Sequence, residues 1–205
     1  MLSSYPAGSQ ERSSPGGTTR CRAGPSTDWT VAAIHLDLEP VQMTAGYLDL
    51  LGELRQMFDR VGFEGALSVV SSGFTSSWSP SYLRRVSRLV DQIDPMYYDS
   101  EFTTVADYQA WITDSLAYYS AHAAPTVRIV PVLPAYSRNR WHRPNVENVD
   151  TATKALSAAL ESGSRVSGAG IWWWWGFFYD EDGAYDASKD RSAWQSGTRN
   201  LPFSD

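Results

Sequence analysis

The chain has 205 residues, a formal net charge of −6 and a sequence pI near 5.0. Hydrophobic residues make up 42% and charged residues 20%, a balance typical of a soluble globular domain with its own core. The acidic balance argues against nucleic acid as a partner, because no basic surface would neutralise a row of phosphates. No apolar run of about 18 residues occurs, so no membrane-spanning segment is expected.

Aromatic residues are the unusual part of the composition, with nine Trp, eleven Tyr and seven Phe. Aromatic faces stack on the apolar faces of sugar rings, so a carbohydrate ligand is one interpretation. The other interpretation is that these side chains fill a core. Composition alone favours the core.

Residues 1–28 are rich in Ser, Gly, Pro, Thr and Arg and have almost no large apolar residues. This composition predicts a disordered segment, or one that lies outside the true reading frame. Cys21 is the single cysteine, so an internal disulfide is excluded. Residues 29–205 are expected to form the structured domain.

From Trp29 onward, short apolar runs alternate with longer amphipathic stretches. The runs predict five strands and the stretches predict four helices. In chain order, the elements are a strand over 31–38, a helix over 43–60, a strand over 66–71, a helix over 80–90, a strand over 91–97, a helix over 104–122, a strand over 127–134, a helix over 146–162 and a strand over 168–175.

This alternation indicates the α/β class, with a parallel sheet and helices outside it. A complete (β/α) TIM barrel has eight strands and about 250 residues. The sequence therefore predicts a partial TIM-type barrel made of its last five βα units. A doubly wound open sheet is the competing fold, but no Gly-rich phosphate loop follows any of the strands.

The run from Ile34 to Pro40 carries the most chemistry. Side chains alternate along a strand, so His35, Asp37 and Glu39 share one face, which points inward in a barrel. Glu39 comes last, at the rim where barrel active sites lie. Two neighbouring carboxylates raise the pKa of one of them, which favours a protonated acid. The alternatives are a buried polar network or a metal site.

The same run resembles the signature of glycoside hydrolase family 18, D-x-x-D-x-D-x-E on the fourth barrel strand. Asp37 and Glu39 stand at its last Asp and its catalytic Glu, while His35 replaces another Asp. That replacement puts turnover in question, because the inner Asp of the family helps to orient and tune its neighbour.

Three later segments resemble the same family in the same order. Residues 90–99 are similar to a sixth strand ending M-x-Y-D, and residues 134–138 are similar to P-x-Y-G-R on a seventh strand. Residues 168–172 are similar to an eighth strand that ends in a Trp under the bound sugar. Each motif is weak by itself, and four in order are more specific.

The resemblance implies substrate-assisted retaining hydrolysis, in which the N-acetyl oxygen of the sugar attacks the anomeric carbon. Glu39 would protonate the glycosidic oxygen and later activate water, and Asp37 would hold the acetamido group and stabilise positive charge. The implied substrate-binding residues are His35, Met96, Tyr98, Asp99, Tyr136, Arg138, Trp172 and Trp174.

Several of these residues have an ordinary structural alternative. Met96 suits a core position, Tyr98 and Asp99 suit a hydrogen-bonded loop pair, and Arg138 suits a surface charge. Alternation puts Trp172 and Trp174 on one face, which the resemblance turns inward. The segment 141–142 (Trp-His) is either a rim that stacks on sugar or loop packing.

The predicted function is hydrolysis of a polysaccharide containing N-acetylglucosamine, such as chitin or a peptidoglycan-like polymer, without cofactor or metal. An extracellular or periplasmic location follows from the resemblance. One alternative is another retaining glycosidase with Asn-Glu-Pro on the fourth strand, although Leu38 stands at the Asn position. Another is a non-catalytic carbohydrate-binding pseudoenzyme or a truncated fragment. A partner or a missing N-terminal half would close the barrel.

Overall fold

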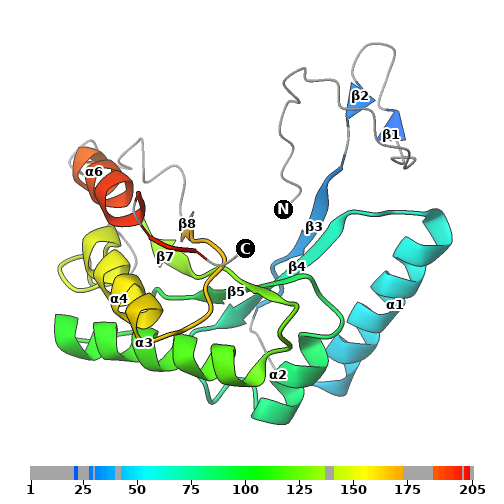
Figure 1. Ribbon diagram of the computed structural model, residues 1–205, viewed down its shortest axis with the longest axis horizontal. Coiled ribbons are helices and arrows are strands. Elements are labelled where there is room, and N and C mark those ends of the chain that lie inside the picture. The colour runs from blue at the N-terminus through cyan, green and yellow to red at the C-terminus, as the bar shows by residue number, and fades with distance from the viewer. Residues whose placement is uncertain are drawn as a thin grey trace.

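The computed structural model describes residues 21–22, 28–29, 31–39, 43–136, 141–172, 187–199 and 201–203. Strands and helices alternate through most of this part of the chain (Figure 1). The elements are β1 (Cys21–Arg22), β2 (Asp28–Trp29), β3 (Ala33–Leu36), α1 (Ala45–Val61), β4 (Ala66–Ser72), α2 (Pro80–Val86), β5 (Gln92–Met96), α3 (Val105–His122), β6 (Arg128–Ile129), β7 (Val132–Pro134), α4 (Val149–Glu161), β8 (Gly170–Trp172) and α6 (Ala187–Thr198).

The main sheet is parallel, with the strand order β3-β4-β5-β7-β8 and with β6 paired beside β5. The sheet curls, and α1 to α4 lie along its outer side (Figure 1). A curled parallel sheet with helices outside is part of a (β/α) barrel. The predicted α/β class and the partial TIM-type barrel are therefore confirmed.

Polar side chains fix the start of each of the first four helices. Thr44, Ser79, Thr104 and Asn148 each accept a hydrogen bond from a backbone N–H three residues further on. Such N-caps satisfy N–H groups that have no partner inside the helix. Gly62 ends α1 with φ 64°, a left-handed conformation that glycine adopts without a Cβ penalty.

The two faces of the sheet differ in character because side chains alternate along each strand. Leu67, Val69 and Ile93 have no exposed surface and pack in the hydrophobic core under the helices. The side chains between them, such as Val70 and Asp94, line a cavity on the inner face. The outer face therefore holds the fold together, and the inner face is available for a site.

Gly73 directly follows the last residue of β4 and links it by a hydrogen bond to the end of β5. Its N–H donates to the Met96 carbonyl at 3.1 Å, and its carbonyl accepts from the Ser115 hydroxyl at 2.6 Å. A Cβ at this position would lie 2.5 Å from the Trp111 ring and 2.8 Å from the Tyr97 ring. Only glycine fits so close to the backbone and rings of its neighbours.

The structure differs from the predicted elements in two places. The strand predicted over 127–134 is two short strands, β6 and β7, with Pro131 between them. Proline has no N–H to donate, so the ladder is interrupted there. The helix predicted over 80–90 ends at Val86 as α2.

Three elements were not predicted at all. The helix α6 contacts α4 near the end of the chain, in a region to which the sequence assigned no structure. The strands β1 and β2 form a two-residue antiparallel pair, which except for Trp29 lies in the segment 1–28. The remainder of that segment lies outside the described residues, so the disorder expected there stays a prediction.

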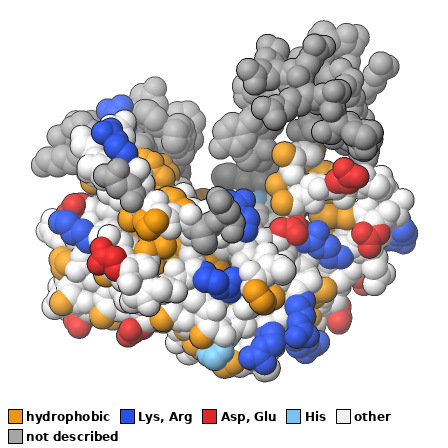
Figure 2. All heavy atoms as spheres, viewed as in Figure 1, with side chains coloured by type: hydrophobic (Ala, Val, Ile, Leu, Met, Phe, Trp, Pro, Cys, Tyr) orange, Lys and Arg blue, Asp and Glu red, His pale blue; other side chains and the backbone are white. Residues whose placement is uncertain are grey.

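None of the helices in the described part of the chain combines the length and the apolar character needed to cross a bilayer. On the face shown in Figure 2, acidic and basic side chains are interspersed with apolar ones. The formal charge of −6 is therefore not gathered into one acidic field on that face.

Candidate active site

A cavity of about 240 Å³ lies on the inner face of the curled sheet. His35 and Asp37, from the end of β3, line it, whereas Ile34 and Leu36 pack against the hydrophobic core on the other side. Five strands and the residues that follow them contribute to its wall. The lining residues are His35, Asp37, Val70, Gln92, Asp94, Met96, Tyr98, Val130, Val132, Gly170, Ile171 and Trp172.

His35 is held by polar groups of the neighbouring strands. Its Nδ1 lies 2.7 Å from the Ser68 hydroxyl and 3.3 Å from Asp94 Oδ2. The Gln92 amide donates to Asp94 Oδ1 at 2.8 Å, so both oxygens of this buried carboxylate have partners. Sequence reasoning missed Gln92 and Asp94 as cavity residues. Their alternation with Met96 on one strand was the signal that could have identified them.

Glu39 follows β3 two residues after Asp37, and its side chain is exposed and close enough to Tyr98 for its charge to act on that phenol. Its pKa is raised, first by partial removal from water and then by the negative charge and hydrogen bond of Asp37, with a further contribution from Asp99. Asp37 is also exposed and lines the cavity. A carboxyl whose pKa is raised in this way holds a proton to higher pH and is suited to act as a general acid.

Aromatic rings form the side of the mouth opposite β3. The Tyr98 ring stacks on Trp172 with centroids 6.0 Å apart and planes 14° apart, and it meets the Tyr136 ring edge-on at 6.1 Å. Burial raises the pKa of Tyr98, and the charges of Glu39 and Asp37 raise it further. The phenol therefore stays protonated and is a hydrogen-bond donor close to both carboxylates.

Asp99 comes one residue later, and the Tyr136 hydroxyl donates to its Oδ1 at 2.6 Å. Burial raises the pKa of Asp99, although the Tyr136 hydrogen bond and the proximity of His142 oppose this rise. Burial also raises the pKa of Tyr136. Asp99 and Tyr136 therefore form a hydrogen-bonded loop contact, and this contact lies at the mouth of the cavity.

Asp99, His142 and Glu147 are, within the described residues, a group whose ligand atoms lie within 4.8 Å of one another and could hold a metal ion. The Glu147 carboxylate is already bonded on both oxygens, by Ser100 on Oε1 and by His142 on Oε2. These contacts satisfy the buried charge without an ion. The arrangement is a hydrogen-bonded network in this structure.

The other predicted site residues divide into two groups. Met96 is 9% exposed and lines the cavity, so it belongs both to the packed sheet and to the site wall. Arg138 and Trp174 lie outside the described residues, and their predicted roles stay predictions. Trp141 is exposed, whereas His142 is buried beneath Tyr136.

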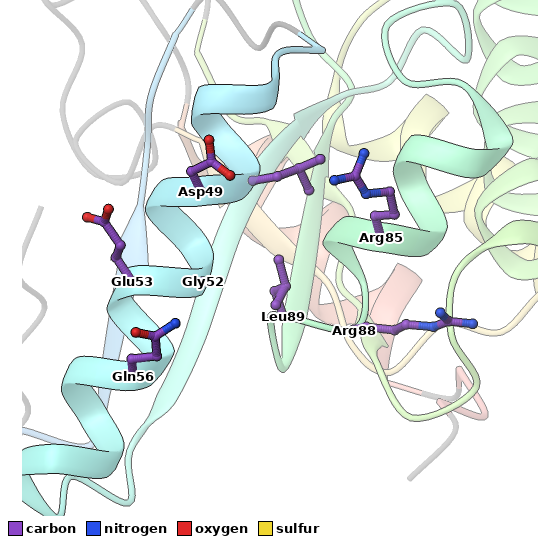
Figure 3. Close-up of a pocket in the computed structure, with 8 residues that line it drawn as sticks. Asp49, Gly52, Glu53, Gln56, Arg85, Arg88 and Leu89 are labelled. Carbon is purple, nitrogen blue, oxygen red and sulfur yellow. The ribbon is translucent and has the colours of Figure 1, made fainter.

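A wider groove of about 500 Å³ lies in the outer layer between α1 and the end of α2. Its charged lining residues do not converge on one point: Arg85 points across toward α1, whereas Arg88 points away from it (Figure 3). Asp49 and Glu53 come from successive turns of α1. The groove therefore has the character of a solvated surface between two helices.

Comparison with solved structures identifies the fold. Concanavalin B matches with a TM-score of 0.57 and 17% sequence identity, over 86% of this chain and 59% of that one. The ICChI chitinase from Ipomoea carnea matches with a TM-score of 0.53 and 16% identity, over 80% of this chain and 57% of that one. The chain thus spans less than three fifths of the length of either protein.

No protein-family model matches the sequence, and no curated protein matches it. The structural matches show that the chain has the (β/α)-barrel fold of these two proteins, which confirms at the level of fold the resemblance that the sequence motifs indicated. At these identities the likeness concerns the fold, and function must be argued from the site.

Proposed function

We propose that the chain is the catalytic-face part of a glycoside hydrolase that acts on a polysaccharide containing N-acetylglucosamine. One observation carries the proposal: Glu39, an exposed carboxyl of raised pKa, lies beside Asp37, which lines a cavity walled by Tyr98 and Trp172. A proton donor next to an aromatic wall is the arrangement that cleavage of a glycosidic bond requires.

In this mechanism Glu39 donates its proton to the glycosidic oxygen as the bond to the anomeric carbon breaks. The acetamido oxygen of the sugar forms the new bond to that carbon, so no nucleophile from the protein is needed. Asp37 orients the acetamido N–H and stabilises the positive charge on the ring intermediate. Glu39, now ionised, then takes a proton from the water that opens this intermediate.

The cavity suits a single sugar ring. Its volume of about 240 Å³ is below the roughly 300–1,000 Å³ of pockets that hold drug-sized ligands. The Tyr98 phenol, kept protonated by burial, supplies a donor for the acetamido oxygen. Trp172, stacked on Tyr98, supplies the apolar floor on which a sugar face packs.

The proposal includes a further set of βα units that closes the ring. Within the described residues, β3 pairs with β4 alone and β8 pairs with β7 alone, so each has an edge that could accept another parallel strand. The two solved structures are longer than this chain by about the length that such units need. An N-terminal half or a partner chain would supply them. We also propose that the protein acts in an extracellular or periplasmic location, where such polymers are found.

The decisive test is hydrolysis of a chromogenic chitobioside by the wild type, Glu39→Gln and Glu64→Gln. Loss of a general acid typically lowers the rate by about 10² to 10⁴, and we expect that loss in Glu39→Gln. Glu64 is an exposed carboxylate that precedes β4, so Glu64→Gln should keep wild-type activity. A glycoside without the acetamido group should not be cleaved, and its turnover would rule out substrate assistance.

A second candidate function is carbohydrate binding without turnover, and His35 is the observation that favours it. The glycosidase signature has an Asp at this position, whereas here an imidazole is held by Ser68 and Asp94. Asp37 therefore lacks the neighbouring carboxyl that normally tunes it. Binding of chito-oligosaccharide without hydrolysis, together with activity gained in His35→Asp, would identify this second function.

A further inference from the structure

A buried carboxylate, Glu147, holds the loop that follows β5 although it lies 47 residues away from it in sequence. Its Oε1 accepts from the Ser100 backbone N–H at 3.1 Å and from the Ser100 hydroxyl at 2.6 Å. Its Oε2 lies 3.2 Å from His142 Nδ1, and neither of these two side chains has any exposed surface. Hydrogen bonds to an ionised acceptor are the strong ones, and their loss leaves buried groups unsatisfied.

The loop that Glu147 holds is strained. Asp99 has φ 54° and Glu101 has φ 62°, and both lie in the left-handed region that favours glycine. A residue other than glycine persists in this conformation only where its surroundings impose it. Ser100 stands between them, and two of its polar groups bind the same carboxylate oxygen. Glu147 thus binds the loop at the residue between its two strained positions.

The same buried pair reaches the loop by a second path. The His142 ring packs against the Tyr136 ring at a centroid distance of 4.3 Å, and the Tyr136 hydroxyl donates to Asp99 Oδ1. His142 faces Glu147 through Nδ1, while its Nε2 is buried without a hydrogen-bond partner. Contacts therefore run in a closed ring from Ser100 back to Asp99.

This ring ends at the groups that would contact the sugar. Tyr98 directly precedes Asp99, and the charge of Asp99 helps to raise the pKa of both Tyr98 and Glu39. A shift of this loop would move the phenol donor and also change the field at the proton donor. Misplacement of catalytic groups by about 1 Å can lower a rate by about 10²-fold.

We propose that Glu147, together with His142, is a positioning residue that clamps the strained turn after β5 so that Tyr98 and Asp99 face Glu39. The clamp is a property of the fold, and its effect on catalysis rests on the proposed function. Two other roles would give different results: support of overall stability alone, and binding of a metal ion by Asp99, His142 and Glu147.

The clamp is tested first by hydrogen exchange on Glu147→Ala, Glu147→Gln and the control Asp150→Asn. Asp150 is an exposed carboxylate on α4 that pairs with Lys154, so its change should leave the loop untouched. We expect backbone exchange in residues 97–103 to rise about tenfold or more in Glu147→Ala, while exchange in β4 and α3 stays at the wild-type level. Glu147→Gln should show a smaller rise, because its amide oxygen still accepts from Ser100.

The catalytic effect is tested by the pH profile of chitobioside hydrolysis. We expect kcat to fall about 10- to 100-fold in Glu147→Ala. The basic limb should move to lower pH, because a displaced Asp99 no longer helps to keep the proton on Glu39. Glu147→Gln should recover part of both effects. A protein that only lost stability would show a smaller active fraction with an unchanged pH profile.

Unchanged exchange in residues 97–103, or a uniform rise throughout the protein, would overturn the clamp. If Glu147→Ala does not fold, the same comparison of exchange in residues 97–103 with exchange in β4 and α3 is made on Glu147→Gln. Stabilisation of the wild type by added Zn²⁺ or Mn²⁺ that vanishes in Glu147→Gln would replace the clamp with a metal site. A wild type that neither cleaves nor binds chito-oligosaccharide would refute the proposed function and leave the exchange result to decide the clamp.

Discussion

The two sides of the cavity mouth are built differently. On the β3 side, Asp37 and Glu39 are exposed and the His35 side chain is 36% exposed. On the side formed by β5 and β7, the side chains of Glu147 and His142 have no exposed surface, and Asp99 contacts His142 through Tyr136. The described chain therefore organises the side with Tyr98 and Asp99 by itself, whereas Glu39, the proposed proton donor, lies on the side that has fewer neighbours.

This contrast has a consequence for a closed ring. A strand added beside β3 would remove more water from Asp37 and Glu39, which are now open to solvent. Further burial would raise the pKa of Glu39 beyond the rise already present, because desolvation is already the largest cause. Closure of the barrel would thus make Glu39 better suited to its proposed role as a general acid, without any change in the residues of the site.

The largest expected effect is on the buried side. Leu116 on α3 has no exposed surface, so Leu116→Ala should destabilise the protein by about 2–5 kcal/mol through lost burial and a new cavity. Leu38, beside the acid on the β3 side, is 47% exposed, and Leu38→Ala should cost less than about 0.5 kcal/mol. Urea unfolding of both variants measures the difference. Equal losses would show that the β3 side is packed as tightly as the other.

A smaller effect is expected from two buried hydroxyls. Tyr108 has no exposed surface and donates to the Tyr97 carbonyl at 2.6 Å, just before the strained loop. Tyr108→Phe leaves that carbonyl without this partner and should cost about 1–3 kcal/mol. Ser68→Ala on the β3 side should cost less, because His35 keeps its contact with Asp94 and is open to water. Thermal unfolding checks the order, and a larger loss in Ser68→Ala would reverse the comparison.

The smallest effect concerns the proton donor and depends on pH. The pKa of Glu39 is higher in the folded protein than its ordinary value of 4.5, so the folded state binds more protons between these two values. Its contribution to stability is therefore greatest below pH 4.5 and is lost as pH rises through the raised value. As pH rises from 4.5 through the raised pKa, Glu39→Gln should become more stable than the wild type. It should remain more stable at neutral pH. The gain should be below about 1 kcal/mol, because the group is exposed.

Denaturant titrations at acid and neutral pH measure this gain, with Glu64→Gln as the matched control, which should show no comparable change. If Glu39→Gln were less stable than the wild type at neutral pH, the folded protein would stabilise the ionised form of the Glu39 carboxyl. The site would then be a poor acid, and the binding function would be favoured.

Most of the fold could be predicted because apolar residues recur with the periods of strands and helices along the chain. The alternating run of β3, for example, separates Leu36 from His35 on opposite faces. The break at Pro131 was not predicted, although a proline inside the strand expected over 127–134 was a signal for it, since proline cannot donate to a ladder. The helix α6 was not readable, because its sequence is polar and its place is set by contact with α4.

The sequence predicted which site residues lie together on one strand, but it did not predict polar contacts between loops that are remote in sequence. The spacing of Asp37 and Glu39 showed that they lie close together, and motif order placed Tyr98 and Trp172 across from them. Glu147 could not be found in this way, because its partner Ser100 is remote in sequence and neither residue belongs to a recognisable motif. Long-range polar contacts depend on how the loops pack, which periodicity does not encode.

Gly73 ties three elements of the barrel together. Its backbone continues directly from β4, its N–H donates to the Met96 carbonyl at the end of β5, and its carbonyl accepts from the Ser115 hydroxyl on α3. A Cβ here would collide with the Met96 carbonyl and with the Trp111 and Tyr97 rings at once. A single methyl group at this position would therefore disturb the ends of two strands whose residues Val70 and Met96 line the cavity.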